Sequence, residues 1–96
     1  MNLTSLHQNE KPVSANLLFK SENAGTAISI QILKSERLAE HSTKTSAVAV
    51  CVSGKAIFEN ENGEKHELSN GDYVLIEPHV KHWIDAIETT QILLVK

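Results

Sequence analysis

The residues of this chain that are best suited to chemistry are two of its five histidines, His41 and His82. His41 stands just before an apolar segment, and His82 opens the segment HWIDA, in which His82, Ile84 and Ala86 share one face if the segment is a strand. A barrel that places the two segments side by side would bring both imidazoles to one interior. Two neutral imidazoles, with a carboxylate or waters, suit Fe, Mn, Ni or Zn.

The other chemistry-bearing residues have simpler expected roles. His7 lies in a polar arm and His66 lies among charges beside a turn, so we expect both to be solvated. His79 is expected at the barrel mouth with its ring in solvent, and Cys51 is expected to be a small buried apolar residue. Asp72 is expected to cap a turn. No spacing of Ser, His, Asp or Cys supports nucleophilic catalysis.

Short β-rich segments must position these residues. The pair Asn62-Gly63 is a strong hairpin signal, and only SERLAE (residues 35–40) has helical composition, over too short a length to form a stable helix. SAVAVCV is apolar on both faces, which favours core on one face and a subunit contact on the other. We expect a polar arm over residues 1–15 and a single domain over residues 16–96. Strands are expected over residues 16–20, 26–34, 46–52, 55–60, 64–69, 73–77, 82–86 and 89–96.

Length and composition exclude several classes of protein. The 96 residues allow one domain, and the net charge of −3, with a pI of about 5.9, provides no basic face for nucleic acid. No stretch approaches the roughly 20 apolar residues that span a membrane. The N-terminal residues lack the pattern of a signal peptide, and the single cysteine cannot form an internal disulfide. We therefore expect a protein of the reducing cytoplasm, without nucleic-acid or membrane partners.

Two segments, EHSTKTSAVAVCVSG (residues 40–54) and GDYVLIEPHVKHWIDA (residues 71–86), resemble the two motifs of the cupin superfamily. The resemblance is to small single-domain cupins of the cupin 2 type. It implies an all-β fold, an antiparallel jelly-roll β-barrel of about eight to ten short strands, and it also implies a homodimer.

The resemblance further implies a reduced metal site. A typical metal-binding cupin offers three histidines and a glutamate, and here His41 and His82 stand at two of those four positions. Thr43 stands at the position of another histidine, and Ala47 stands at that of the glutamate. The implied cofactor is a weakly held divalent transition metal (Zn, Fe, Mn or Ni), because tight zinc sites generally use three or four protein ligands. Glu40 is a candidate third ligand and Cys51 a distant one.

Several interpretations of this site follow. The ligand pocket is expected to be lined by His41, Thr43, Ala47, Cys51, His82 and Ile84. We favour a module that binds or senses a small molecule of unknown identity. One alternative is a metalloenzyme, a dioxygenase or isomerase that uses His41 and His82 with a third ligand. The remaining interpretations are a dimeric scaffold without a ligand, and a histidine pair that only makes hydrogen bonds inside the barrel.

Overall fold

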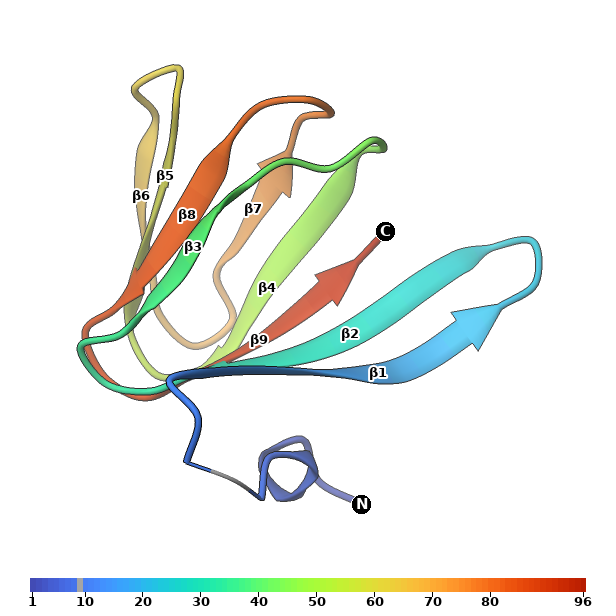
Figure 1. Cartoon of the computed structure of the whole chain (residues 1–96), viewed down its shortest axis with the longest axis vertical. Coiled ribbons are helices and arrows are strands. Elements are labelled where there is room, and N and C mark those ends of the chain that lie inside the picture. The colour runs from blue at the N-terminus through green and yellow to red at the C-terminus, as the bar shows by residue number, and fades with distance from the viewer. Residues whose placement is uncertain (9) are drawn as a thin grey trace.

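The computed structural model describes residues 1–8 and 10–96, which contain nine strands and one short 3-10 turn, η1 (Thr4–Leu6) (Figure 1). No helix in these residues is long and apolar enough to cross a membrane. The strands confirm the predicted all-β class and fall within the expected number. They are β1 (Val13–Ser21), β2 (Gly25–Ile32), β3 (Arg37–His41), β4 (Ala47–Ser53), β5 (Ala56–Asn60), β6 (Lys65–Leu68), β7 (Tyr73–Ile76), β8 (His82–Ala86) and β9 (Thr90–Val95).

The strands form two antiparallel sheets that face one another, as expected for a jelly roll (Figure 1). The five-stranded sheet has the order β1-β2-β9-β4-β7, and the four-stranded sheet has the order β3-β8-β5-β6. Strands β7 and β6 are the edges of their sheets on one side of the molecule, and β1 and β3 are the other two edges. Strand β8 lies between β3 and β5, so His82 has a neighbouring strand on each side.

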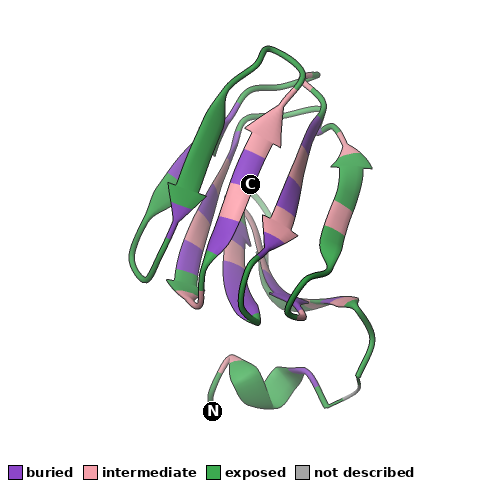
Figure 2. Ribbon diagram, turned by 90° about the vertical axis from the view of Figure 1, so that its left-hand side faces the viewer, coloured by how far each residue is buried: buried purple, intermediate pink, exposed green. Residues whose placement is uncertain are grey.

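The core lies between the sheets and follows the two-residue period of the strands. On β4 the buried residues are Ala47, Ala49 and Cys51, which share a face as predicted. Burial alternates in the same way along β8, where His82, Ile84 and Ala86 are buried. Figure 2 shows such bands of buried and partly buried residues along several strands. The alternation places each inward side chain of these strands in the space between the sheets.

Residues 37–41 form strand β3, although SERLAE has helical composition. Leu38 and His41 lie opposite Ile84 and His82 of β8, and Leu38 packs against the core. A single helical turn is unstable alone, whereas β8 supplies backbone hydrogen bonds and a buried neighbour. The tertiary pairing therefore decides the structure of this segment, and His41 ends a strand instead of preceding one.

The expectation that His7 is solvated is wrong. His7 is 8% exposed, with Nδ1 2.6 Å from the hydroxyl of Ser14 and Nε2 2.9 Å from the hydroxyl of Ser29. Both serines lie on the outer face of the five-stranded sheet, and β1 begins at Val13, before the expected start at Asn16. The arm reaches across that face because the two hydroxyls provide a partner for each ring nitrogen, and burial lowers the pKa of His7.

Candidate functional site

The structure brings His41 and His82 together. They lie directly opposite one another at the end of β3 and the start of β8. Side chains opposite one another in an antiparallel pair project from the same face of the sheet. The two rings meet edge to face, with centroids 4.2 Å apart and an interplanar angle of 61°, and their Nε2 atoms are 3.1 Å apart.

The hydrogen bonds of the two Nδ1 atoms determine whether each Nε2 atom carries a hydrogen. Nδ1 of His41 lies 2.9 Å from the carbonyl oxygen of Ala39, and Nδ1 of His82 lies 3.1 Å from that of Val80. A carbonyl oxygen only accepts, so each Nδ1 carries a hydrogen, and in a neutral ring Nε2 is then an acceptor. Two acceptors 3.1 Å apart repel one another unless a proton or a metal cation is shared between them.

Burial favours the neutral form of His82. The side chain is 2% exposed and stacks on the ring of Phe58, with centroids 5.7 Å apart. Removal from water lowers the pKa of His82, the carbonyl of Val80 raises it in part, and the neighbouring His41 lowers it further. His82 is therefore uncharged at neutral pH, and the uncharged imidazole is the form that binds metal ions.

The pair fits a metal ion as two adjacent ligands of a larger coordination shell. Two nitrogens bound next to each other on one ion, each about 2.0–2.1 Å away, lie roughly 3 Å apart. In the part of the chain that the structure describes, no group of three His, Cys, Asp or Glu residues is placed to hold a metal. Within the described residues the histidine pair therefore provides two protein ligands for such an ion.

Thr43 and Ala47 lie at the same end of the barrel as the histidines. Ala47 begins β4, and the carbonyl of Thr43 accepts a hydrogen bond from the backbone N–H of His79, 2.7 Å away, which joins the loops before β4 and β8. The hydroxyl of Thr43 donates to the carbonyl of Thr45, 2.8 Å away. The side chain of Ala47 has no atom that can bind a metal ion, so this end of the barrel offers fewer metal ligands than a typical metal-binding cupin would.

Cys51 and Ile84 are part of the hydrophobic core. Cys51 is fully buried four residues beyond Ala47 on β4, a step of about 13 Å along a strand. Its thiol lies near the carbonyls of Ser53 and Gly54, and burial, together with the charge of Asp72, raises its pKa. Ile84 is 2% exposed in the same core. The Cys51 thiol therefore lies far from the histidine end of the barrel.

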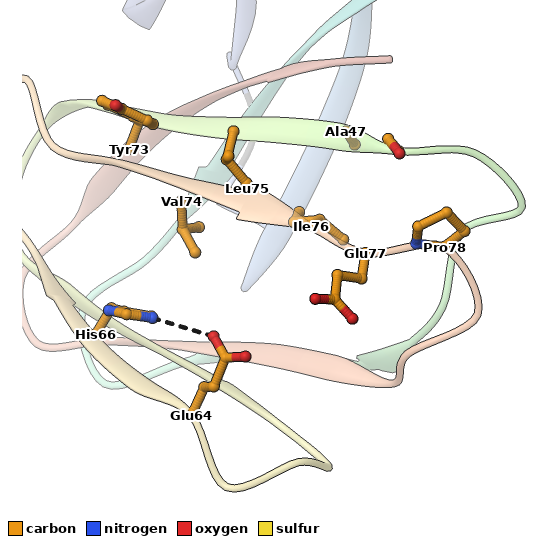
Figure 3. A pocket seen from close by; sticks show the side chains of 10 residues that line it. Ala47, Glu64, His66, Tyr73, Val74, Leu75, Ile76, Glu77 and Pro78 are labelled. Carbon is orange, nitrogen blue, oxygen red and sulfur yellow. Dashed lines mark hydrogen bonds and ion pairs between the residues drawn. The ribbon is translucent and has the colours of Figure 1, made fainter.

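The cavity at this end opens between the edge strands β6 and β7, and sequence reasoning missed most of it. Its volume is about 640 Å³, and of the expected pocket residues only Ala47 lines it. Val74 and Glu77 point across it towards Glu64 and His66, whereas Leu75 points to the other side of the sheet (Figure 3). The full lining is Ser46, Ala47, Glu64, His66, Tyr73, Val74, Leu75, Ile76, Glu77 and Pro78.

The polar side chains that line this cavity are the carboxylates of Glu64 and Glu77, the imidazole of His66 and the hydroxyls of Ser46 and Tyr73. Nε2 of His66 lies 3.4 Å from Glu64, and both side chains are about half exposed, so the expectation of a solvated His66 holds. The signal for the cavity was present in the sequence, because residues 64 and 66 share the strand face of Leu68, which is buried. Because side chains alternate between the two faces of a strand, Glu64 and His66 lie on the inner face of the sheet with Leu68.

The comparisons with known proteins agree with this fold. Residues 29–95 match the family model described as a cupin domain, and the chain belongs to that family. No curated protein matches the chain.

Solved structures resemble it over nearly its whole length. A conserved protein of unknown function from Streptococcus pyogenes has 20% identity and a TM-score of 0.80 over 99% of this chain and 82% of that one. A cupin superfamily protein from Desulfitobacterium hafniense has 16% identity and a TM-score of 0.84 over 98% and 84% of the two chains. KdgF from a Halomonas species has 22% identity and a TM-score of 0.77 over 93% and 83%. At these identities the likeness shows the fold alone.

Proposed function

We propose that this cupin is a small-molecule binding module that holds a divalent transition metal weakly between His41 and His82. The observation that carries the proposal is the approach of the two Nε2 atoms to 3.1 Å while both Nδ1 atoms face carbonyl oxygens. A metal ion accepts both lone pairs at once and so removes the repulsion between them. A shared proton would relieve the same repulsion, but the burial of His82, which lowers its pKa, disfavours that protonated state.

The ligand set predicts modest affinity and an open coordination shell. Two imidazoles are fewer ligands than the three or four of a tight zinc site. The remaining positions would be filled by water or by the polar group of a bound molecule. The cavity of about 640 Å³ has a size typical of small-molecule sites and shares Ala47 with the histidine end of the barrel.

Calorimetric titration of the purified protein with Zn²⁺ and, separately, with Ni²⁺ tests the proposal. The expected result is one ion per chain, with an affinity that falls about tenfold or more in both His41→Ala and His82→Ala. His79→Asn is the matched control, because His79 is exposed and Asn tolerates its left-handed backbone, φ 64°. The control is expected to bind like the parent protein.

Two results would count against this site. One is the absence of binding by the parent protein at millimolar metal. The other is binding that His41→Ala and His82→Ala leave unchanged but that His79→Asn or His66→Gln weakens, since this would place the ion on surface histidines. Circular dichroism of each variant separates loss of binding from loss of fold.

A further inference from the structure

The cavity between β6 and β7 brings two carboxylates from different sheets to face one another. Glu64 immediately precedes β6 of the four-stranded sheet, and Glu77 immediately follows β7 of the five-stranded sheet. Figure 3 shows the side chain of Glu77 pointing across the cavity towards Glu64 and His66. Among the described residues, neither a lysine nor an arginine lines the cavity. The lining is therefore acidic, with His66 as its basic side chain.

The orientation of Glu77 is not the one that strand alternation favours. Tyr73 and Leu75 are exposed, whereas Val74 and Ile76 are buried, so a further residue in the same period would point to the outer face. Because β7 ends at Ile76, Glu77 is free of this period and turns its side chain into the cavity (Figure 3). In the part of the chain that the structure describes, its carboxylate has neither a hydrogen-bond partner nor an ion-pair partner.

His66 can balance the charge of one of the two carboxylates. Its Nε2 atom lies 3.4 Å from a carboxylate oxygen of Glu64. A protonated imidazole carries one positive charge, whereas the two carboxylates carry two negative charges. A cation between Glu64 and Glu77 would be attracted by both, and an anion in the same place would be repelled by both. The charges of this cavity therefore favour a cationic occupant.

The remaining lining suits the body of an organic molecule. Ala47, Val74 and Ile76 line the cavity and belong to the hydrophobic core, so they present an apolar surface beside the carboxylates. The hydroxyls of Ser46 and Tyr73 are further acceptors for N–H groups. The volume of about 640 Å³ lies within the range of small-molecule sites, in which a mostly apolar lining carries a few polar groups.

We infer that this cavity binds an organic ammonium compound, a small molecule with a protonated amine and an apolar body. The amine lies between Glu64 and Glu77 and donates its N–H groups to both carboxylates, and the body packs on Val74 and Ile76. A bare metal ion is a poorer occupant, because no group of three His, Cys, Asp or Glu among the described residues is placed to hold one. The inference rests on the proposed small-molecule binding function and names the class of that molecule. It does not need the metal ion, because neither His41 nor His82 lines the cavity.

NMR titration of the backbone amides with three probe compounds that share one hydrocarbon ring tests the inference. The probes are cyclohexylamine, which is protonated at neutral pH, the neutral cyclohexanol and the anionic cyclohexanecarboxylate, and a chelator keeps metal ions out of the titration. We expect cyclohexylamine to shift the resonances of Val74 and Ile76 saturably, with a dissociation constant on the order of 1 mM. The neutral and anionic probes are expected to bind about tenfold or more weakly.

Glutamine at either carboxylate position removes one charge and keeps the shape of the side chain. Glu64→Gln and Glu77→Gln are each expected to raise the dissociation constant of cyclohexylamine about threefold or more. Glu67→Gln is the matched control, because Glu67 is an exposed residue of β6 that does not line the cavity. The control is expected to bind like the parent protein. All three residues are exposed, so the fold should survive, which an unchanged far-ultraviolet circular dichroism spectrum would verify.

Several results would overturn the inference. They are the absence of a saturable shift with cyclohexylamine, equal or tighter binding of cyclohexanol or cyclohexanecarboxylate, and an equal loss of affinity in Glu67→Gln, which would indicate a general attraction to an acidic protein. Failure of the proposed metal site is a separate outcome. Binding of cyclohexylamine without binding of Zn²⁺ or Ni²⁺ would support this inference and contradict only the metal site, whereas metal binding without binding of cyclohexylamine would contradict only this inference.

Discussion

The Nε2 atoms of His41 and His82 lie 3.1 Å apart, although the Nδ1 atom of each ring already faces a carbonyl oxygen. The arrangement follows from strand register, because the two residues are direct partners in the β3–β8 ladder. It leaves the lone pairs of the two Nε2 atoms close to one another, and a cation bound by both would stabilise both rings. The two nitrogens of the proposed metal site thus come from neighbouring strands of one sheet.

Truncation of His82 is expected to destabilise the fold more than truncation of His41. His82 is 2% exposed and stacked on Phe58, whereas His41 is half-buried. We expect His82→Ala to lower the free energy of unfolding by about 2–4 kcal/mol, as for other large-to-small core changes. His41→Ala should cost about 1 kcal/mol. Urea unfolding in the presence of a chelator measures both, and equal costs for the two variants would contradict the burial difference.

Acidification is expected to destabilise the protein through His7 and His82. Burial lowers the pKa of each below the ordinary 6.5, so the folded state takes up protons less readily than the unfolded chain. The stability that the two neutral histidines contribute to the folded state is fully present above pH 6.5. It is lost as the pH falls below 6.5 through the lowered pKa values of the folded state.

Urea unfolding at a series of pH values from neutral to mildly acidic measures this loss. The slope of stability against pH should become shallower in His7→Gln, whereas His66→Gln, which changes an exposed histidine, serves as the control. Stability that is constant or rises on acidification, or an identical slope in His7→Gln, would contradict the buried position of His7.

Two glycines with left-handed backbone should respond differently to alanine. Gly54 has φ 101° and Gly63 has φ 83°, so alanine is strained at both, by about 1–2 kcal/mol. At Gly54 the added Cβ would also collide with the carbonyl oxygen of Thr89 and lie 2.8 Å from Oγ1 of Thr90, whereas at Gly63 it meets open space. Gly54→Ala should therefore cost about 1–3 kcal/mol more than Gly63→Ala by thermal or urea unfolding. Equal losses of stability in the two variants would show that the backbone at Gly54 moves away from Thr89 and Thr90 to admit the Cβ atom.

The thiol of Cys51 is expected to be unreactive in the folded protein. It is fully buried, and its pKa is raised by burial and by the charge of Asp72, which reduces the thiolate fraction. Its reaction with an aromatic disulfide reagent should follow the unfolded fraction as urea is added. Ile87→Cys in a Cys51→Ala background is the exposed control and should react without urea. Rapid labelling of Cys51 in the native protein would place it in an accessible pocket.

The sequence was informative where the signal is local. Period-two alternation and the Asn62-Gly63 turn place most strands within a residue or two, and HWIDA forms strand β8 over the expected residues. The strand over residues 37–41 was not predicted, because β3 owes its conformation to pairing with β8. The cavity could not be predicted in full, since it forms where the unpaired edges of β6 and β7 face one another across two sheets.

In the candidate site, too, local patterns predicted the positions of residues, whereas contacts between distant segments were not predicted. The inward side of His82 follows from alternation, whereas its pairing with His41 was expected only if a barrel placed the two segments side by side. The buried contacts of His7 arise from Ser14 and Ser29, which no local pattern connects to the arm. Contacts between segments that are distant in sequence were thus the part that sequence reasoning missed.

Nitrogen-15 NMR of the imidazole rings, recorded before and after addition of one equivalent of Zn²⁺, tests metal binding by His41 and His82 most directly. We expect the Nε2 resonances of His41 and His82 to shift together, with both rings protonated at Nδ1, while those of His66 and His79 stay in place. Shifts confined to the exposed histidines, or a hydrogen on Nε2 of His41 or His82 in the presence of zinc, would contradict it.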